Sequence, residues 1–309
     1  MDGQAFLDAI RADLDDDAPR LIYADWLEET DRIEGAARAD FIRVQCALAR
    51  EPLDHAERTD WLVRERELLE DHRAAWEGPL RKLGAETIEF RRGFAEFIEL
   101  SAGSFRRHDE AIIKLTPGLR GVELSLRGAT VLQLRGWTSL RRLQHLGLPA
   151  CDLGEDGARL LAGSPHLLNL RSLSLWRNGI GATGARSLAA APALGNLEHL
   201  DLYGNDLGRN GVEALARSPV LGKLRSLDLS DNGLRGPAAM TIAESPRLRE
   251  LESLDLEGNE INRTAAEDMA AHLSLPKLRR LNLRRNRLGA KPETLRLTPG
   301  FNALEVFQV

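Results

Sequence analysis

The stretch LRSLSLWRNGI, residues 170–180, decides the fold, because close copies of it recur along the chain. The copies read LQHLGLPACDL (143–153), LEHLDLYGNDL (197–207), LRSLDLSDNGL (224–234), LESLDLEGNEI (251–261) and LRRLNLRRNRL (278–288). Their first leucines stand 27 residues apart, and the shared pattern is L-x-x-L-x-L-x-x-N-x-[L/I]. A fixed period of this length predicts an array of like units, each of which packs on its neighbours.

The second half of each repeat predicts a short helix. Small residues such as Gly184 and Ala185 are followed four positions later by Leu188 and Ala189, which marks one buried helical face. A proline then ends the helix in four repeats, because proline cannot continue the backbone hydrogen-bond ladder. These prolines are Pro165, Pro192, Pro219 and Pro246. Each repeat is therefore expected to fold as strand, turn, helix and turn.

The widths of the two elements predict a curved array. Parallel strands stack about 4.8 Å apart, whereas helices with their side chains are about 10 Å across. We therefore expect a right-handed α/β solenoid, a horseshoe with a parallel concave sheet and short convex helices. At the end of each strand, an inward amide can satisfy backbone groups of the neighbouring turns. This structural column consists of Cys151, Asn178, Asn205, Asn232, Asn259 and Asn286.

These motifs resemble the ribonuclease-inhibitor-like class of leucine-rich repeats, in which cysteine can replace the asparagine. The resemblance covers residues 119–309, and the repeats here are slightly shorter than is usual for that class. LRGVELSL (119–126) looks like a degenerate entry repeat, and LEVFQV (304–309) supplies a terminal strand. The resemblance implies the solenoid fold and a role in binding other proteins.

The N-terminal third does not repeat. Residues 1–83 read as helices that form an N-terminal cap for the solenoid, and residues 84–118 as a β-containing transition, with Gly93 at a kink or turn. Large apolar side chains at helical spacing are expected in the core of the cap. They are Ile22, Trp26, Phe41, Trp61, Leu68 and Trp76. A ligand site formed by Tyr23, Asp25 and Trp26 is the weaker alternative.

The N-terminal segment also resembles a known domain. FLDAIRADLDDDAPRLIYADWLEE (6–29), then ADFIRVQCALAR (39–50) and RRGF (91–94), is similar to the bacterial repeat-companion domain that precedes leucine-rich and related repeats. The resemblance implies an architecture and a bacterial source, and it brings no activity or catalytic residue with it.

The variable positions of the repeats define the candidate site. Side chains alternate along a strand, so the residues between the conserved leucines point away from the core onto the concave face. Trp176 and Tyr203 fill the same slot of adjacent repeats, where packing needs no aromatic ring, and exposed aromatics are typical anchors of protein interfaces. We therefore expect a partner-binding face that grades from aromatic to acidic to basic. Its residues are Trp176, Tyr203, Arg177, Asp201, Asp228, Asp231, Asp255, Glu257, Arg284 and Arg285.

Composition excludes several classes of function. The net charge of −5 offers no general attraction to nucleic acid or anionic membranes, and it divides into −9 for residues 1–83 and +4 for the remainder. The N-terminus lacks the apolar segment of a signal peptide, and no apolar run approaches the about 20 residues of a membrane helix. Two cysteines are too few for a disulfide framework. We expect a cytoplasmic protein whose partner is another protein, without metal or cofactor.

The sequence contains no convincing catalytic motif. His145 and His199 alternate with Ser172 and Ser226 in one column, but these serines belong to the repeat pattern and no oxyanion hole accompanies them. We therefore expect a non-enzymatic scaffold. Two alternatives stay open: a substrate-recognition subunit or effector of a ligase- or protease-linked system, and self-assembly through the C-terminal edge of the solenoid. The oligomeric state is expected to be a monomer or a weak homodimer.

Overall fold

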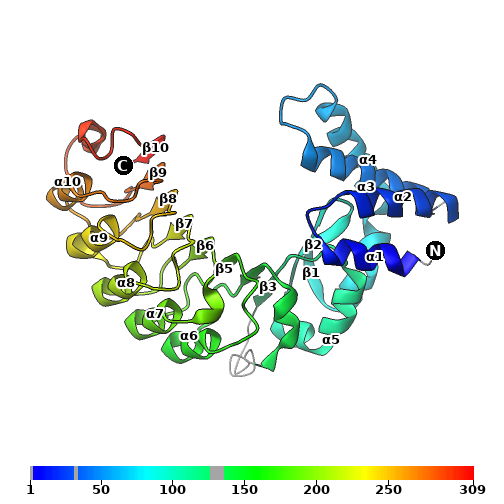
Figure 1. Ribbon diagram of the computed structural model, residues 1–309, viewed down its shortest axis with the longest axis horizontal. Helices are drawn as coiled ribbons and strands as arrows, with labels where there is room; N and C mark the ends of the chain where they lie inside the picture. Colours follow the sequence, from blue (N-terminus) through cyan, green and yellow to red (C-terminus); the bar gives the residue numbers. More distant parts are fainter. Residues whose placement is uncertain (1–2, 31–33, 126–135) are drawn as a thin grey trace. The chain divides into compact units, whose positions relative to one another are not determined.

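The computed structural model describes residues 3–30, 34–125 and 136–309, and it divides into two compact units, Met1–Leu124 and Ser125–Val309. Leu126, the last residue of the expected entry repeat, lies outside the described residues. Each unit is described by itself (Figure 1).

The first unit is built from helices and a β-hairpin. In chain order its elements are α1 (Gly3–Ala12), α2 (Ala18–Thr30), α3 (Glu34–Arg50), α4 (Arg58–Lys82), β1 (Ala85–Arg91), β2 (Phe94–Ser101), α5 (Ala102–Leu115) and β3 (Gly121–Ser125). β1 and β2 pair antiparallel, with Arg91 opposite Phe94. The two residues between the strands, Arg92 and Gly93, both have positive φ, +49° and +83°. This geometry matches the right-handed twist of a two-residue hairpin.

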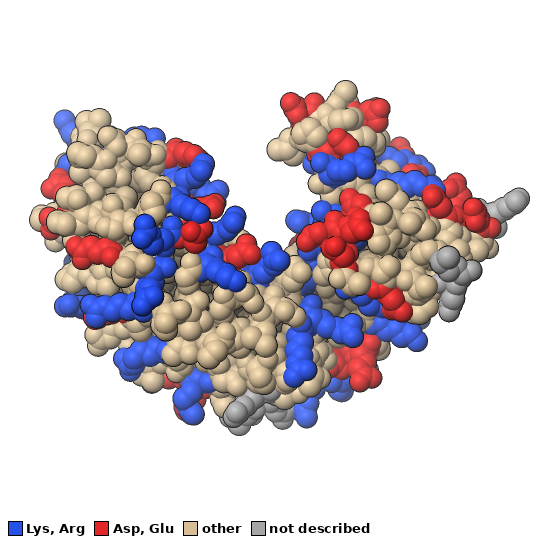
Figure 2. Space-filling model, viewed as in Figure 1, with Lys and Arg blue, Asp and Glu red and all other residues tan. Residues whose placement is uncertain are grey.

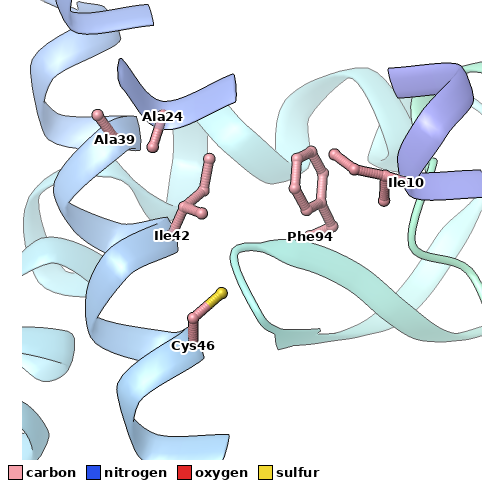
Figure 3. Packing of buried hydrophobic residues seen from close by; sticks show 6 residues of the cluster. All are labelled: Ile10, Ala24, Ala39, Ile42, Cys46 and Phe94. Atoms are coloured by element: carbon pink, nitrogen blue, oxygen red, sulfur yellow. The ribbon is translucent and has the colours of Figure 1, made fainter. Parts of the chain in front are cut away.

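The core of this unit lies between α2, α3 and the hairpin. Ala39, Ile42 and Cys46 follow one face of α3, and Ala24 of α2 and Phe94 of β2 belong to the same cluster, as does Ile10 of α1 (Figure 3). The helical spacing of the three α3 residues explains why one face of this polar helix is buried.

The expected core of the N-terminal segment is partly wrong. Phe41 and Leu68 are buried, but Ile22 is 52% exposed. The buried side of α2 carries Arg20 and Ala24, and Ile22, two positions from each, points about 200° away from both. Trp26, Trp61 and Trp76 are partly buried. Helix α5 was also missed, although Ser101 caps it by accepting from Ser104 N at 3.0 Å.

The second unit confirms the predicted α/β solenoid of leucine-rich repeats. Its strands are β4 (His145–Gly147), β5 (Ser172–Ser174), β6 (His199–Asp201), β7 (Ser226–Asp228), β8 (Ser253–Asp255), β9 (Arg280–Asn282) and β10 (Val306–Gln308). From β4 to β9 every residue pairs in parallel with the residue 27 positions later, such as Leu173 with Leu200. The pairing of neighbouring strands therefore has the same 27-residue period as the sequence.

Helices line the outer side of this unit and strands its inner side (Figure 1). The helices are α6 (Gly154–Ala162), α7 (Gly181–Ala189), α8 (Gly208–Ala216), α9 (Arg235–Ala243) and α10 (Arg263–Ala271), and the 3-10 turns are η2 (Thr138–Arg142), η3 (Pro192–Leu194) and η4 (Pro292–Leu297). α6 to α9 each end three residues before a proline. The repeat leucines are buried throughout, for example Leu175, Leu202 and Leu229 at 0% exposure. The core thus fills the space between the two layers.

The backbone conformation of Arg235 suggests a substitution that stabilises the repeats. The first residue of each helix from α6 to α9 has a left-handed backbone conformation. Its φ is +60° at Gly154, +59° at Gly181, +53° at Gly208 and +59° at Arg235. Only glycine adopts this conformation without steric cost, which is about 1–2 kcal/mol for other residues.

Arg235→Gly is therefore expected to raise the free energy of unfolding by about 1 kcal/mol. Its ion pair with Glu260, 3.4 Å long and largely exposed, offsets little of that gain. Urea unfolding followed by circular dichroism measures the change, and Arg217→Gly, just after α8, serves as control because Arg217 has no positive φ. A loss of stability in Arg235→Gly would contradict the expectation.

Candidate functional site

The asparagine column builds the base on which the concave face rests. Asn205 is fully buried, and its Nδ2 donates to the carbonyl of Leu175 at 2.8 Å and to that of Tyr203 at 3.2 Å. Its Oδ1 accepts from the backbone N–H of Asn178 at 2.9 Å and of Ile180 at 3.3 Å. The same bonds recur one repeat apart along the column. The six members are Cys151, Asn178, Asn205, Asn232, Asn259 and Asn286.

Cys151 is the one member of the column without a side-chain amide. Its N–H donates to Asn178 Oδ1 at 2.9 Å, just as the N–H of Asn178 donates to Asn205 Oδ1, and its Sγ donates to the carbonyl of Pro149 at 3.2 Å. The column therefore fixes the turn that follows every strand, and with it the direction in which the next side chains leave the sheet.

The aromatic pair lies on that fixed turn. Trp176 and Tyr203 follow β5 and β6 at equivalent positions, and both are partly exposed. The backbone is in register there, because Ala150 N donates to Trp176 O and Arg177 N donates to Tyr203 O, at 2.9 and 2.8 Å. The two residues therefore occupy neighbouring rungs, about 4.8 Å apart along the sheet.

Arg177 orders the tyrosine. Its guanidinium lies 5.2 Å from the centre of the Tyr203 ring, and its Nη2 donates to the Tyr203 hydroxyl at 2.8 Å. Arg177 itself is exposed and has a φ of +53°. The cation–π contact and the hydrogen bond restrict the orientation of the phenol.

Three carboxylates form the central row of the face. Asp201, Asp228 and Asp255 are paired residues of β6, β7 and β8. Each accepts from the backbone N–H two residues later, namely Tyr203 at 3.0 Å, Ser230 at 2.9 Å and Glu257 at 2.9 Å. The side chains thus brace the strand ends as well as carrying negative charge.

Burial raises the pKa of Asp228, and the nearby carboxylates of Asp255 and Asp201 raise it further, against hydrogen bonds from Ser230 that lower it. A carboxyl whose folded pKa exceeds its ordinary value of 3.8 penalises folding when ionised. The penalty is full above the folded pKa and disappears as the pH falls toward 3.8.

Asp228→Asn is therefore expected to be more stable than the parent protein at pH 7. The amide oxygen can still accept from Ser230, and the charge repulsion is gone. The advantage should shrink as the pH is lowered, which urea unfolding at a series of pH values measures. Asp206→Asn, an exposed change in the turn after β6, is the control. A stability difference that does not change with pH would contradict the expectation.

The basic end of the face is partly neutralised. Arg285 lies 3.7 Å from Asp231 and 3.5 Å from Glu257. Arg284 is exposed and forms no ion pair among the residues that the structure describes. Acidic and basic side chains are interspersed along the inner margin of this unit (Figure 2). Arg284 and Arg177 are thus the two exposed cations of the predicted set that form no ion pair among the described residues.

An alternating ladder of charged side chains, not predicted from the sequence, runs along the start of the strands. From the second repeat onward, the residue after the first leucine alternates between arginine and glutamate. Ion pairs link Arg171 to Glu198 at 3.3 Å, Arg225 to Glu252 at 3.7 Å and Arg279 to Glu305 at 2.9 Å. Reading that position down the repeats could have found it. The ladder neutralises its own charges and leaves the central carboxylates as the unpaired acidic row.

The candidate catalytic residues do not form a catalytic arrangement. His145, Ser172, His199 and Ser226 are the first residues of successive strands, and in the described part of the chain neither serine hydrogen-bonds a histidine. Burial, with a smaller contribution from the nearby Asp17, raises the pKa of Cys46 to about 12. A buried neutral thiol is a poor nucleophile. Among the described residues no group of histidine, cysteine and carboxylate side chains could hold a metal ion.

Comparison with known proteins identifies the repeats. Residues 166–189, 196–216 and 223–243 match the Leucine Rich repeat family. The second unit is thus a solenoid of leucine-rich repeats, a fold that typically serves as a non-enzymatic scaffold for protein–protein interaction. A search of the curated proteins finds no match. No helix in the described ranges has both the length and the apolar character needed to cross a bilayer.

Three solved structures are similar to this chain. One, from yeast, is described as a Rad7 and Elc1 complex, with 14% identity over 89% of this chain and 87% of that chain and a TM-score of 0.45. The mouse RP105/MD-1 complex shares 20% identity over 54% of this chain and 34% of that chain, with a TM-score of 0.32. An internalin, inlF, from Listeria monocytogenes str. 4b F2365 shares 14% identity over 62% and 68%, with a TM-score of 0.28.

Proposed function

We propose that the protein is a non-enzymatic scaffold that binds a partner protein through the concave face of its leucine-rich repeats. One observation carries the proposal: Trp176 and Tyr203 stand partly exposed on neighbouring rungs, and Arg177 holds the phenol in place. Aromatic rings with a fixed orientation are the side chains that contribute most to protein interfaces. The core of the repeats does not use either ring.

The charge of the face supports a partner with an apolar side chain and basic residues. Asp201, Asp228 and Asp255 make hydrogen bonds but no ion pair among the described residues. Arg284 at the other end offers a positive charge. A partner whose basic groups meet the carboxylates and whose apolar group contacts the aromatic pair would satisfy both features.

Trp176→Ala with Tyr203→Ala is expected to weaken partner binding by about 2 kcal/mol or more, a loss of about 30-fold in affinity. Isothermal titration with a partner isolated by affinity capture measures the change. Leu168→Ala, at a more exposed apolar residue elsewhere on the unit (53% exposed), is the control. Unchanged affinity of the double variant, with the unfolding midpoint intact, would remove these residues from the site.

We further propose that the N-terminal segment belongs to the bacterial repeat-companion domain and that the protein acts in the cytoplasm of a bacterium. The proposed domains are the companion domain at 1–83, the transition at 84–118 and the repeats at 119–309. The motifs at residues 6–29 and 91–94 support the domain, and a content of two cysteines, too few for a disulfide framework, supports the location. Native mass spectrometry of a chain spanning 1–118 tests whether this segment is an independent domain.

Self-association is a second proposal. The last strand, β10, carries Val306 at 42% exposure, and Leu297 of η4 is 81% exposed. An exposed strand with apolar neighbours can pair with a second chain. Light scattering separates a monomer from a dimer, and Val306→Lys should abolish any dimer that uses this edge.

A further inference from the structure

A groove in the first unit is lined by three elements. Its volume is about 420 Å3, and it lies where the C-terminal half of α3, the first turns of α4 and the end of β1 meet. Leu48 of α3, Leu62 of α4 and Phe90 of β1 form its apolar walls. Leu62 is 49% exposed, although it sits on a helix beside other apolar groups. A volume of this size accommodates one or two large side chains.

One buried side chain holds the groove in shape. Gln45 is 5% exposed, and its Nε2 donates to Glu65 Oε1 at 2.7 Å and to the carbonyl of Phe90 at 3.1 Å. Its Oε1 accepts from Gly93 N at 2.7 Å. The amide therefore ties α3 to α4, to β1 and to the hairpin turn. A groove whose walls are already fixed binds with a smaller loss of entropy.

The rim of the groove is basic within an acidic unit. Three arginines line it, and one of them, Arg92, pairs with Asp17 at 3.0 Å. Arg58 is anchored by bonds from its Nη1 to the carbonyls of Leu48 and Glu51, and the guanidinium of Arg91 lies 5.9 Å from the centre of the Phe97 ring. Neither arginine forms an ion pair among the described residues. The single carboxylate of the lining, Glu65, is already held by Gln45.

We propose that this groove is a second docking site, and that it binds a partner segment with a leucine- or phenylalanine-like side chain next to a carboxylate. The apolar side chain packs between Leu62 and Phe90. The carboxylate meets the guanidinium groups of Arg58 and Arg91, which offer charge-assisted hydrogen bonds. The site is separate from the concave face of the repeats and does not depend on the function proposed for it.

Fluorescence polarisation tests the site with a defined probe. The probe is an acetylated and amidated peptide of sequence Glu-Leu-Glu-Leu-Glu that carries fluorescein, and its two controls replace every Glu by Lys or every Leu by Ala. The full chain is expected to bind the first peptide at least about tenfold more tightly than either control, because each control removes one half of the recognition. Raising the salt concentration should weaken binding, since the rim charges are exposed to solvent.

Two substitutions locate the binding. Leu62→Ala is expected to weaken binding about tenfold and Arg91→Glu by a similar factor, whereas both chains should fold because the side chains are exposed. Leu53→Ala, at a residue 84% exposed outside the groove lining, and Arg66→Glu, on another side of α4, are the matched controls and should leave affinity unchanged. Trp176→Ala should also leave it unchanged.

Three results would overturn the proposal. The lysine peptide could bind as tightly as the glutamate peptide, or the groove variants could bind like their controls. Free phosphate or acetate at millimolar concentration could displace the probe completely, which would make the groove a small-anion site. Equal loss of affinity in Trp176→Ala would move the peptide to the concave face and leave the function proposed for that face untouched.

Discussion

Asn205→Ala is expected to lower the free energy of unfolding by about 3 kcal/mol or more, since each buried group left without a partner costs about 1–3 kcal/mol. The amide of Asn205 serves four buried backbone groups. The N–H groups of Asn178 and Ile180 lose their acceptor. The carbonyls of Leu175 and Tyr203 each lose one donor but keep another, Asn178 Nδ2 and Arg177 N respectively. A methyl group can replace none of these bonds, and Asn205 has no exposed surface through which water could reach them.

Urea unfolding followed by circular dichroism measures this loss, and Asn210→Ala is the matched control. Asn210 lies on the exposed side of α8, so its replacement should change stability by about 0.5 kcal/mol or less. Because each repeat is stabilised by its neighbours, the buried change should also broaden the transition or divide it in two. Similar values for the two variants would contradict the role assigned to the column.

Gly93→Ala is expected to destabilise the first unit by about 3 kcal/mol, through left-handed strain of about 1–2 kcal/mol and overpacking of similar size. Gly93 has a φ of +83°, and an added Cβ would lie 2.7 Å from the backbone Cα of Ile42. Neither atom can move cheaply, because α3 is fixed by its core residues. Displacing the turn would also break the 2.7 Å bond from Gly93 N to Gln45.

Hydrogen exchange read by mass spectrometry can assign the loss to α3 and the hairpin. Gly78→Ala provides the control, because Gly78 lies inside α4 with no atom within 4 Å of an added Cβ. That change should stabilise the helix by about 0.5–1 kcal/mol. If Gly93→Ala exchanged no faster than the parent chain, the hairpin would not be coupled to α3 as described.

The periodic part of the fold was predictable because burial repeats with the sequence. Leu200, for example, pairs with its own copies Leu173 and Leu227 in the repeats on either side, so one motif specifies both the strand and its neighbours. The asparagine column follows from the same logic. Even the slot shared by Trp176 and Tyr203 could be located, since equivalent positions must fall on one row.

The sequence did not predict which charged side chains of the candidate site already form ion pairs or hydrogen bonds within the protein. Asp231 and Glu257 were assigned to partner binding, but Arg285 already lies within 3.7 Å of both. One carboxylate oxygen of Asp201 already accepts a hydrogen bond from the N–H of Tyr203. Such pairings depend on which long side chain reaches which neighbour, and sequence spacing does not fix that.

In the N-terminal unit, residue spacing did not predict which face of each helix is buried. Ile22 was placed in the core because it is large and apolar, yet the buried face of α2 is set by Arg20 and Ala24, which contact α3 and the acidic loop. Helix α5 was overlooked because its two largest buried residues, Phe105 and Ile112, lie seven positions apart among charged residues. Without a repeat, each helix has a different neighbour and its inner face must be known individually.

The sequence by itself determined the solenoid and its register, because a period of 27 residues places every repeat in the same environment. Only the tertiary structure decided which of those charges remain free, how Arg177 holds Tyr203, and that Gln45 shapes a groove in the first unit. Those features depend on contacts between residues far apart in the chain, whose geometry no local pattern encodes.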